Sequence, residues 1–323
     1  MYSKQQAINL MNRWGGQKLP FFFMVDFELQ KPVLYLLDEL PESISFDING
    51  VKMNVPVNEP NKDFTFKASP VEFEFYKQAF DQVMRELNYG NSYLLNLTVS
   101  TPITTNLSLE SIFCRSKAPY KLLLKNKLVA FSPEPFIKII NGNISSYPMK
   151  GTIDAALPDA KNTVLNDAKE KAEHATIVDL IRNDLSKVAT NVALTNYRYV
   201  EEVKTSNKTL LQVSSKIEGT LPTNYLEQLG DIIFALLPAG SISGAPKKKT
   251  IEIIKNSEQQ PRGYFAGIMG VFDGINIDSG VIIRYIEQKN DKFAFRSGGG
   301  ITSQSNAVSE YQELLDKVYV PFD

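Results

Sequence analysis

Short stretches of alternating hydrophobic and polar residues dominate the first sixty positions of the chain. Four of them, FFFMVDF, PVLYLL, ISFDING and VKMNVPV, lie within residues 20–58 and predict the strands of a meander. The spacing changes after Pro70, and apolar residues then recur every three to four positions up to Gly90. This second pattern predicts an amphipathic helix with one buried face, formed by Phe73, Tyr76, Phe80, Val83 and Leu87.

Strand and helix patterns alternate irregularly along the rest of the chain. YLLNLTVS predicts a strand, and residues 120–149 predict paired strands with a hairpin turn at Asn141-Gly142. We expect a long helix at about 162–188, strands at about 195–203 and 210–218, and a helix near 224–236. GYFAGIMGVFDG, GVIIRYIEQ and KFAFRSGGGI predict further strands, and a helix follows Asn306. Hairpin signals outnumber βαβ units, which indicates an α+β fold with large antiparallel sheets.

Composition narrows the class of protein. The 323 residues are 43% hydrophobic and 22% charged, as in ordinary globular proteins, with a net charge of −1. No broad basic field favours nucleic acid or a membrane surface, and no signal peptide or membrane-spanning run is visible. We therefore expect a cytoplasmic protein that binds neither nucleic acid nor membrane.

The chain has a single cysteine, Cys114, and a single histidine, His174. One cysteine excludes an internal disulfide and a cysteine-based zinc cluster. An amidotransferase of the Cys-His type needs both residues in contact, but Cys114 lies in SIFCRSKAP, which is typical of a buried helix tail. Chemistry here should therefore depend on carboxylates, lysine, arginine, backbone amides or a hard metal ion.

Candidate metal ligands lie on two predicted helices. Glu173 shares one face of the predicted helix with Ile177 and Asp184, which indicates a position at the edge of a buried surface. The alternative is an ordinary solvent-exposed helix glutamate. Glu310 and Glu313 lie one turn apart in SNAVSEYQELLDKV, where Glu313 could instead pair with a lysine four residues on. Carboxylates from two helices suit Mg²⁺ with positions open for an anionic substrate.

Three segments could bind anions. The glycines of SGGGI (297–301) allow close backbone approach and expose N–H groups, unless this is only a bulged strand end. Arg284, in a predicted strand, shares an apolar face with its neighbours and needs a carboxylate from the protein or from a substrate. PAGSISGAPK (238–247) places Pro246 at a helix start and Lys247 after it, but lacks the ending of a phosphate-binding P-loop.

Lys150 is the candidate nucleophile. It lies in YPMKGT at a strand end, shortly after SPEPF. An ordinary lysine has a pKa of about 10.4 and is a poor nucleophile near neutrality. Burial or a nearby cation would lower that pKa, whereas a solvent-facing lysine would stay inert.

Taken together, the segments SPEPF, PMKGT, AEHATIVDLIRNDL, IEG, PAGSISGAPKKKTIEII, RGYFAGIMG, IIRY and SGGGITSQSNAVSEYQELLDKV resemble the chorismate-utilising enzymes. That family includes anthranilate synthase component I, aminodeoxychorismate synthase component I, and isochorismate and salicylate synthases. The segments occur in the family's order over roughly residues 71–320. An ordered set of this size is far more specific than any single motif.

The resemblance implies a layered sandwich of two large antiparallel sheets flanked by helices, with the site between them. Residues 71–323 would form the chorismate-binding catalytic domain, and residues 1–70 a short strand-rich part of the same structural unit. Glu173 and Glu313 would hold Mg²⁺, with Glu310 nearby. Glu134 would protonate the departing C4 hydroxyl of chorismate. Substrate-binding groups would come from Arg284, Ser243, Lys247, Phe265 and the amides of Gly298, Gly299 and Gly300.

Within the family that these segments resemble, Lys150 indicates the aminodeoxychorismate synthase branch, because members of the other branches carry a small residue before Gly-Thr. The implied mechanism has the Lys150 amine attack C2 of chorismate as the C4 hydroxyl leaves, after which ammonia attacks C4 and expels the lysine. Ammonia would come from glutamine through a separate amidotransferase subunit.

Two departures from the family pattern bear on the product. Gln212 stands where most members carry a histidine tied to pyruvate elimination, and a glutamine cannot shuttle a proton as imidazole does. No tryptophan-binding site is recognisable in residues 1–70. The alternatives are an anthranilate synthase component I and a non-catalytic binding subunit with the same fold.

Overall fold

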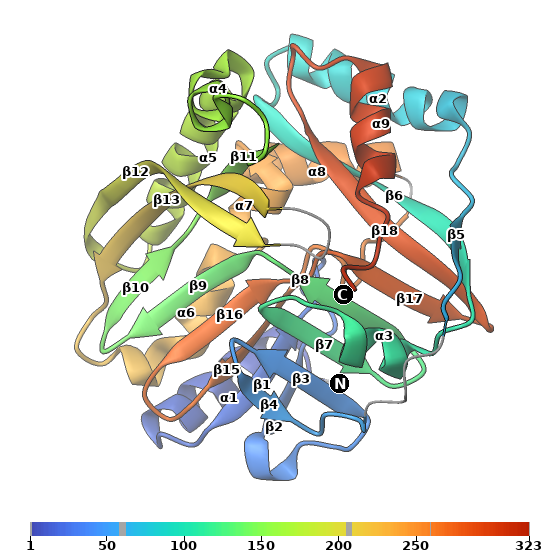
Figure 1. The fold of residues 1–323 in the computed structure, drawn as a ribbon. Helices are drawn as coiled ribbons and strands as arrows, with labels where there is room; N and C mark the ends of the chain where they lie inside the picture. The colour runs from blue at the N-terminus through green and yellow to red at the C-terminus, as the bar shows by residue number, and fades with distance from the viewer. Residues whose placement is uncertain (1, 58–62, 205–208, 259, 323) are drawn as a thin grey trace.

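Two large antiparallel sheets flanked by helices form the fold (Figure 1). The computed structural model describes residues 2–57, 63–204, 209–258 and 260–322. Within these ranges each sheet has nine strands, so the predicted α+β class and its layered sheets are confirmed. Sheet A contains β1 (Phe21–Val25), β2 (Val33–Leu36), β9 (Pro135–Ile140), β10 (Asn143–Ser146), β11 (Met149–Asp154), β12 (Thr190–Lys204), β13 (Thr209–Thr220), β15 (Ile268–Phe272) and β16 (Ile277–Val281).

Sheet B is built from segments that alternate with those of sheet A along the chain. Its path runs β14-β6-β18-β17-β8-β7-β3-β4, with β5 paired to β6, whereas sheet A runs β11-β13-β10-β9-β16-β15-β1-β2, with β12 paired to β13. Sheet B contains β3 (Ile44–Ile48), β4 (Val51–Met53), β5 (Phe66–Ala68), β6 (Leu94–Thr105), β7 (Tyr120–Leu124), β8 (Leu128–Ser132), β14 (Gly244–Ala245), β17 (Tyr285–Lys289) and β18 (Lys292–Ile301).

The two sheets meet through aromatic side chains. Phe22 of β1 stacks on Phe46 of β3, with ring centroids 5.1 Å apart. Tyr120 of β7 lies so close to Gly280 of β16 that an added Cβ would be 2.4 Å from the ring, which explains the glycine. The Tyr120 hydroxyl donates to Asp278 at 2.9 Å, so the sheets are joined by a polar contact as well as by the core.

Helices cover the outer faces and the ends of the sheets. The helix predicted after Pro70 is present, although it begins at Phe73, and its buried face carries the expected side chains. No helix in the described ranges is both long and apolar enough to span a bilayer. The helices are α1 (Lys4–Gly16), α2 (Phe73–Asn88), α3 (Leu109–Arg115), α4 (Ala160–Asn166), α5 (Ala168–Leu185), α6 (Leu229–Leu236), α7 (Gly240–Ser243), α8 (Lys247–Glu258) and α9 (Ala307–Asp316), with short 3-10 turns η1 (Leu37–Glu39) and η2 (Tyr225–Gln228).

Three expectations about elements were wrong. The four N-terminal strands are not one meander, because β1 and β2 join sheet A while β3 and β4 join sheet B. The helix expected over 162–188 is two helices, because the backbone turns at Asp167, whose carboxylate accepts from the Glu170 amide and caps α5. The helix expected near 224–236 begins with the 3-10 turn η2 before α6.

Two chain crossings between the sheets lie side by side. β8 of sheet B leads into β9 of sheet A, and β16 of sheet A leads into β17 of sheet B. Val281 N–H donates to the Glu134 carbonyl at 3.0 Å, and Phe131 N–H donates to the Arg284 carbonyl at 3.0 Å. The crossings therefore fix Glu134 and Arg284 next to each other at the boundary between the sheets.

Arg284 is consequently not in a strand, as the pattern GVIIRYIEQ suggested. It has φ of 52° and lies between β16 and β17, where the chain changes sheets. The apolar neighbours Ile282 and Ile286 made the run resemble one continuous strand. The backbone turn at Arg284 interrupts it and leaves the side chain at the sheet boundary.

Candidate active site

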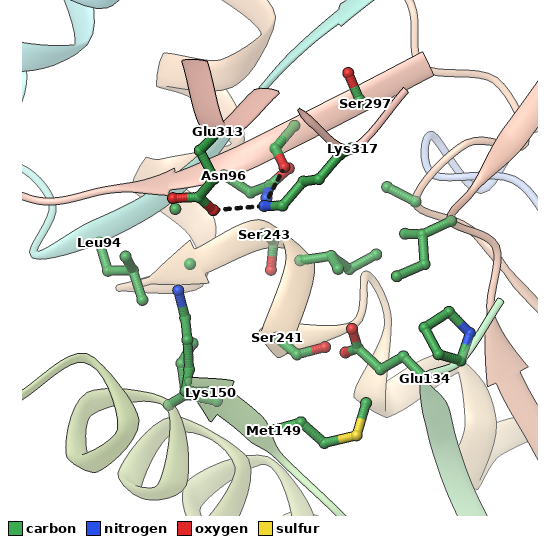
Figure 2. Close-up of a pocket in the computed structure, with 18 of the residues that line it drawn as sticks. Leu94, Asn96, Glu134, Met149, Lys150, Ser241, Ser243, Ser297, Glu313 and Lys317 are labelled. Atoms are coloured by element: carbon green, nitrogen blue, oxygen red, sulfur yellow. Dashed lines mark hydrogen bonds and ion pairs between the residues drawn. The ribbon is translucent and has the colours of Figure 1, made fainter. Parts of the chain in front are cut away.

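A cavity of about 480 Å³ lies between the sheets and is lined by residues of β11 and β18 among others (Figure 2). This cavity is lined by many of the residues that were selected from the sequence, although they come from distant parts of the chain. Those that line the cavity are Glu134, Lys150, Ser243, Phe265, Arg284, Gly298, Gly300 and Glu313. The structure therefore assembles one polar chamber from most of the predicted segments.

Lys150 reaches this cavity from an irregular strand. The register of β11 against β13 shifts between Met149 and Thr152, and Gly151 has φ of 86°. Such a bulge rotates a side chain out of the regular alternation of a strand. The Lys150 ammonium lies 2.5 Å from the carboxylate of Glu173 on α5.

The charge state of Lys150 follows from this ion pair. Burial acts to lower the pKa of Lys150, but the Glu173 carboxylate, its hydrogen bond, and the more distant Glu170 and Glu313 outweigh burial, so the pKa is raised. Before any ligand binds, Lys150 is therefore an ammonium ion held in a negative field. The lowered pKa that would activate it is not present in this arrangement.

The predicted metal ligands lie on both sides of the glycine strand. Glu173 is 4% exposed and its carboxylate would lie 3.6 Å from a Cβ added to Gly300. Glu313 and Glu310 of α9 approach Gly299 from the other face, at 3.8 Å and 3.7 Å from a Cβ there. In the described part of the chain, no three His, Cys, Asp or Glu side chains gather closely enough to form a metal-binding group.

Strand β18 presents a free edge to the cavity. Its pairing with β17 ends at Arg296, so residues 297–301 pair only with β6. Opposite Gly298, the Thr98 amide donates to Glu258 instead of to β18, which makes this a non-hydrogen-bonded pair. Hydrogen-bonded and non-hydrogen-bonded pairs alternate along an antiparallel ladder. The amides of Gly298 and Gly300 therefore point away from β6, whereas the Gly299 amide points toward β6. Two of the three predicted amides thus face the free edge.

Two cations lie among these groups. No hydrogen bond or ion pair is found for the Arg284 guanidinium within the described ranges; it lies over the Tyr319 ring, with 5.5 Å between Cζ and the ring centroid. The Lys317 ammonium donates to the Gly298 carbonyl at 2.9 Å and to Glu313 at 2.6 Å. Burial, with Arg284 and Lys150 nearby, lowers the pKa of Lys317 despite Glu313.

Lys317 is a cavity residue that the sequence interpretation missed. The i,i+4 spacing of Glu313 and Lys317 by itself indicates only an ion pair on a helix surface. The available signal was its spacing, because a residue four positions after Glu313 shares the face assigned to metal binding.

Glu134 lies at the opposite side of the cavity from Lys150 (Figure 2). Burial raises the pKa of the Glu134 carboxyl above its ordinary value, while the nearby Ser241 side chain and the charges of Lys150, Arg284 and Lys317 act in the other direction. A carboxyl with a raised pKa can hold a proton near neutrality and donate it. Ser241, in the same segment as the predicted Ser243, was also missed.

The remaining predicted pocket residues differ in their position. Phe265 is 3% exposed and forms an apolar wall. The Ser243 hydroxyl lines the cavity but donates back to the Ala239 carbonyl at 2.8 Å. Lys247 does not line the cavity; its ammonium binds Asp184 at 2.5 Å and the Leu236 carbonyl at 2.8 Å. Gln212 lines the cavity, and its amide donates to the Met149 sulfur.

A buried ion pair supports one wall of the cavity. Arg262 and Glu258 are each 1% exposed in their side chains and lie 2.6 Å apart. The guanidinium also donates to the carbonyls of Ile242 and Asn96, and Glu258 accepts from the Thr98 amide. The pair thus joins α7, α8 and β6 behind the cavity-lining residues.

We expect Glu258→Gln to lower the free energy of unfolding by about 3 kcal/mol, because it leaves Arg262 buried without its counter-charge. Urea denaturation measures this. The matched control on the same helix is Glu252→Gln, whose ion pair with Lys249 is half exposed and should contribute less than about 1 kcal/mol. Equal losses in both variants would contradict the assigned role of the buried pair.

The lone cysteine and the lone histidine occupy different environments. Cys114 on α3 donates to the Pro56 carbonyl, and burial raises its thiol pKa. His174 on α5 is 1% exposed and bonds the Ser215 hydroxyl at 2.7 Å, and burial lowers its pKa to about 4. Neither residue has the surroundings of an activated nucleophile and its base.

The chain is similar to known proteins along most of its length. The sequence model of the chorismate binding enzymes matches residues 34–323. The chain is 51% identical to an uncharacterized PabA-like protein of Haemophilus influenzae over 99% of this chain and 97% of that protein. It is 34% identical to aminodeoxychorismate synthase component 1 of Escherichia coli over 80% of this chain and 60% of that protein.

The fold has solved counterparts. The menaquinone-specific isochorismate synthase MenF of Escherichia coli superimposes with a TM-score of 0.76 at 13% identity, covering 98% of this chain and 81% of that one. At this identity the similarity concerns the fold alone. The sequence match, in contrast, spans most of the chain and includes every segment that lines the cavity. The chain belongs to the family of chorismate binding enzymes.

Proposed function

We propose that the protein is an aminodeoxychorismate synthase component that replaces the C4 hydroxyl of chorismate with an amine. The observation that carries the proposal is a lysine, Lys150, facing a carboxyl with a raised pKa, Glu134, across one cavity. The match to the Escherichia coli aminodeoxychorismate synthase component 1 supports it. The product, 4-amino-4-deoxychorismate, is the precursor that para-aminobenzoate and folate synthesis would use.

Chorismate carries two carboxylates, and the cavity offers cationic and amide groups for them. Arg284 extends from the crossing between the sheets with no carboxylate partner in the described ranges, so its planar fork is available for a substrate carboxylate. The amides of Gly298 and Gly300 and the ammonium of Lys317 lie at the free edge of β18. Phe265 provides an apolar wall for the ring.

Glu173 and Glu313, with Glu310 nearby, are the residues that would hold Mg²⁺. Their carboxylate oxygens suit a hard cation, and Mg²⁺ is typically bound by only one or two protein carboxylates together with substrate oxygens and water. When bound, the ion would supply positive charge for the ring carboxylate of chorismate. In its absence the two carboxylates are balanced by Lys150 and Lys317.

The chemistry follows from the positions of Lys150 and Glu134. Lys150 first releases a proton to solvent; its neutral amine then forms a bond to C2, the two conjugated ring double bonds shift, and the C4–O bond breaks. Glu134 gives its proton to the departing hydroxyl, which leaves as water. Ammonia next forms a bond to C4, the two double bonds shift back, and the C2–N bond to Lys150 breaks. Two displacements thereby exchange hydroxyl for amine at the same carbon.

Gln212 favours a product that keeps its enolpyruvyl group. Its amide lines the cavity beside Met149 and Ser214 and has no ionisable proton to exchange near neutral pH. Loss of pyruvate requires a base, and the one histidine of the chain is buried against Ser215 instead. The combination supports aminodeoxychorismate over anthranilate.

Product analysis tests the proposal. Purified protein is incubated with chorismate, Mg²⁺ and an ammonium salt, and the products are separated by chromatography and identified by mass. We expect 4-amino-4-deoxychorismate without pyruvate. Anthranilate with an equal amount of pyruvate would instead identify an anthranilate synthase component I, and unchanged chorismate would identify a non-catalytic binding subunit.

We also expect glutamine to be useless to the isolated chain and useful once a separate amidotransferase subunit is added. Cys114 and His174 contact different residues and cannot form the pair that releases ammonia from glutamine. The relatives named as a component 1 and as PabA-like proteins support a multi-component enzyme. Initial rates with glutamine and with ammonium, before and after adding the subunit, measure this; glutamine use that disappears in Cys114→Ala would refute it.

A further inference from the structure

A second, much smaller cavity adjoins the first at Glu134. Its volume is about 20 Å³, which is room for one molecule the size of water. The two cavities share the side chains of Glu134 and Ser241, which lie next to each other in Figure 2. Glu134 and Ser241 therefore lie where the two cavities meet.

The walls of the small cavity are mainly apolar. Ile181 and Leu185 of α5, Leu236 of α6 and Phe136 of β9 contribute hydrocarbon surface, and all four are buried. Asp184 also lines it, but its carboxylate is already bound by Lys187 at 2.7 Å and Lys247 at 2.5 Å. While Glu134 holds its proton, an ammonium ion would lose its hydration here without gaining a free counter-charge. A neutral molecule of the same size would not bear this desolvation cost of a charge.

On the basis of the proposed function, we infer that the small cavity binds neutral ammonia and delivers it to C4 of the substrate past Glu134 and Ser241. Chorismate lying between Lys150 and Glu134 fills the main cavity on one side of the acid. The small cavity reaches the same carboxyl through residues that the substrate does not cover. Nitrogen can therefore arrive next to the carbon from which the hydroxyl has just departed.

The proton balance supports this position. After giving its proton to the leaving hydroxyl, Glu134 is a carboxylate. When ammonia forms its bond to C4, the new group is a protonated amine, and the C2–N bond breaks to release Lys150 as a neutral amine. Glu134 then takes one proton from the new amine and is a carboxylic acid again. Chorismate and ammonia thus give aminodeoxychorismate and water with the enzyme restored.

Filling the small cavity tests the inference. We expect Ile181→Phe to raise the KM for ammonium, at saturating chorismate and fixed pH, by about tenfold, because overpacking of the site opposes occupancy. The KM for chorismate should stay the same. Val178→Phe is the matched control: it lies on the same helix and is 7% exposed like Ile181, but lines neither cavity. A folded Ile181→Phe variant whose ammonium KM equals that of the control would overturn the inference.

Enlarging the cavity gives an independent measurement if Ile181→Phe does not fold. Ile181→Ala should increase the use of methylamine relative to ammonia by several-fold, since the added space admits one more carbon. An unchanged ratio in this variant, with ammonia still accepted, would show that nitrogen enters elsewhere. If the wild-type protein forms no aminated product at all, the proposed function itself is wrong. That outcome is distinct from an unchanged ratio in Ile181→Ala, which contradicts only the inferred route of ammonia.

Discussion

Lys150→Ala should reduce amination with ammonium by at least about a thousandfold, the scale of loss when an enzyme loses its covalent nucleophile. Chorismate binding should survive, because Arg284, Lys317 and the amides of β18 do not depend on this side chain. Steady-state product formation measures the first quantity and titration calorimetry the second. The wild-type enzyme incubated with chorismate alone should also show a lysine-linked adduct by mass spectrometry.

The control for this variant is Lys138→Ala. Lys138 lies on β9 of the same sheet and also forms an ion pair, at 3.0 Å with Asp278, but it does not line the cavity. Its replacement should leave the rate within about threefold of wild type, as for a partly exposed ion pair. Full activity in Lys150→Ala would mean that ammonia attacks chorismate directly, and the assignment to the aminodeoxychorismate branch would lose its main support.

Glu173→Gln and Glu313→Gln should each lower Mg²⁺-dependent turnover by about a hundredfold to a thousandfold. Each change removes one negative charge from a pair of carboxylates that flank adjacent glycines of β18. Turnover measured over a range of Mg²⁺ concentrations separates weaker metal binding from slower chemistry. Thermal denaturation without Mg²⁺ checks that the fold is intact.

Glu310→Gln serves as the comparison within α9. The Glu310 carboxylate accepts a hydrogen bond from the Ser305 hydroxyl at 2.7 Å, and the residue is 2% exposed. This carboxylate therefore already has a structural role within the protein. We expect a smaller loss of turnover than in Glu313→Gln. If Glu310→Gln alone impairs the Mg²⁺ response, the ligand on this helix is Glu310.

The elements with strong local patterns were predictable from the sequence. The helix after Pro70 has five apolar residues on one face and became α2, and Asn141-Gly142 became a hairpin turn with positive φ at both residues. Helix α1 was not predicted, although Ser3 and Gln6 form a capping box at its start.

The arrangement of the site depended on long-range contacts that no local pattern contains. The position of Arg284 follows from a crossing between sheets, and that of Lys247 from Asp184, 63 residues away in the chain. The charge state of Lys150 depends on a carboxylate 23 residues further on. The residue types could be selected from the sequence, but their partners could not.

The first four strands of the chain lie at the ends of the two sheets that are away from Lys150. β1 and β2 close one end of sheet A, and β3 and β4 close the same end of sheet B, as the lower part of Figure 1 shows. Toward the other end lie Lys150 of β11, the glycines of β18, Glu173 of α5 and Glu313 of α9. Glu134 lies between them and the first strands, at the crossing from β8 to β9. Insertions in the turns among the first fifty residues would therefore lengthen these ends of the sheets and leave the spacing of Lys150 and Glu134 intact.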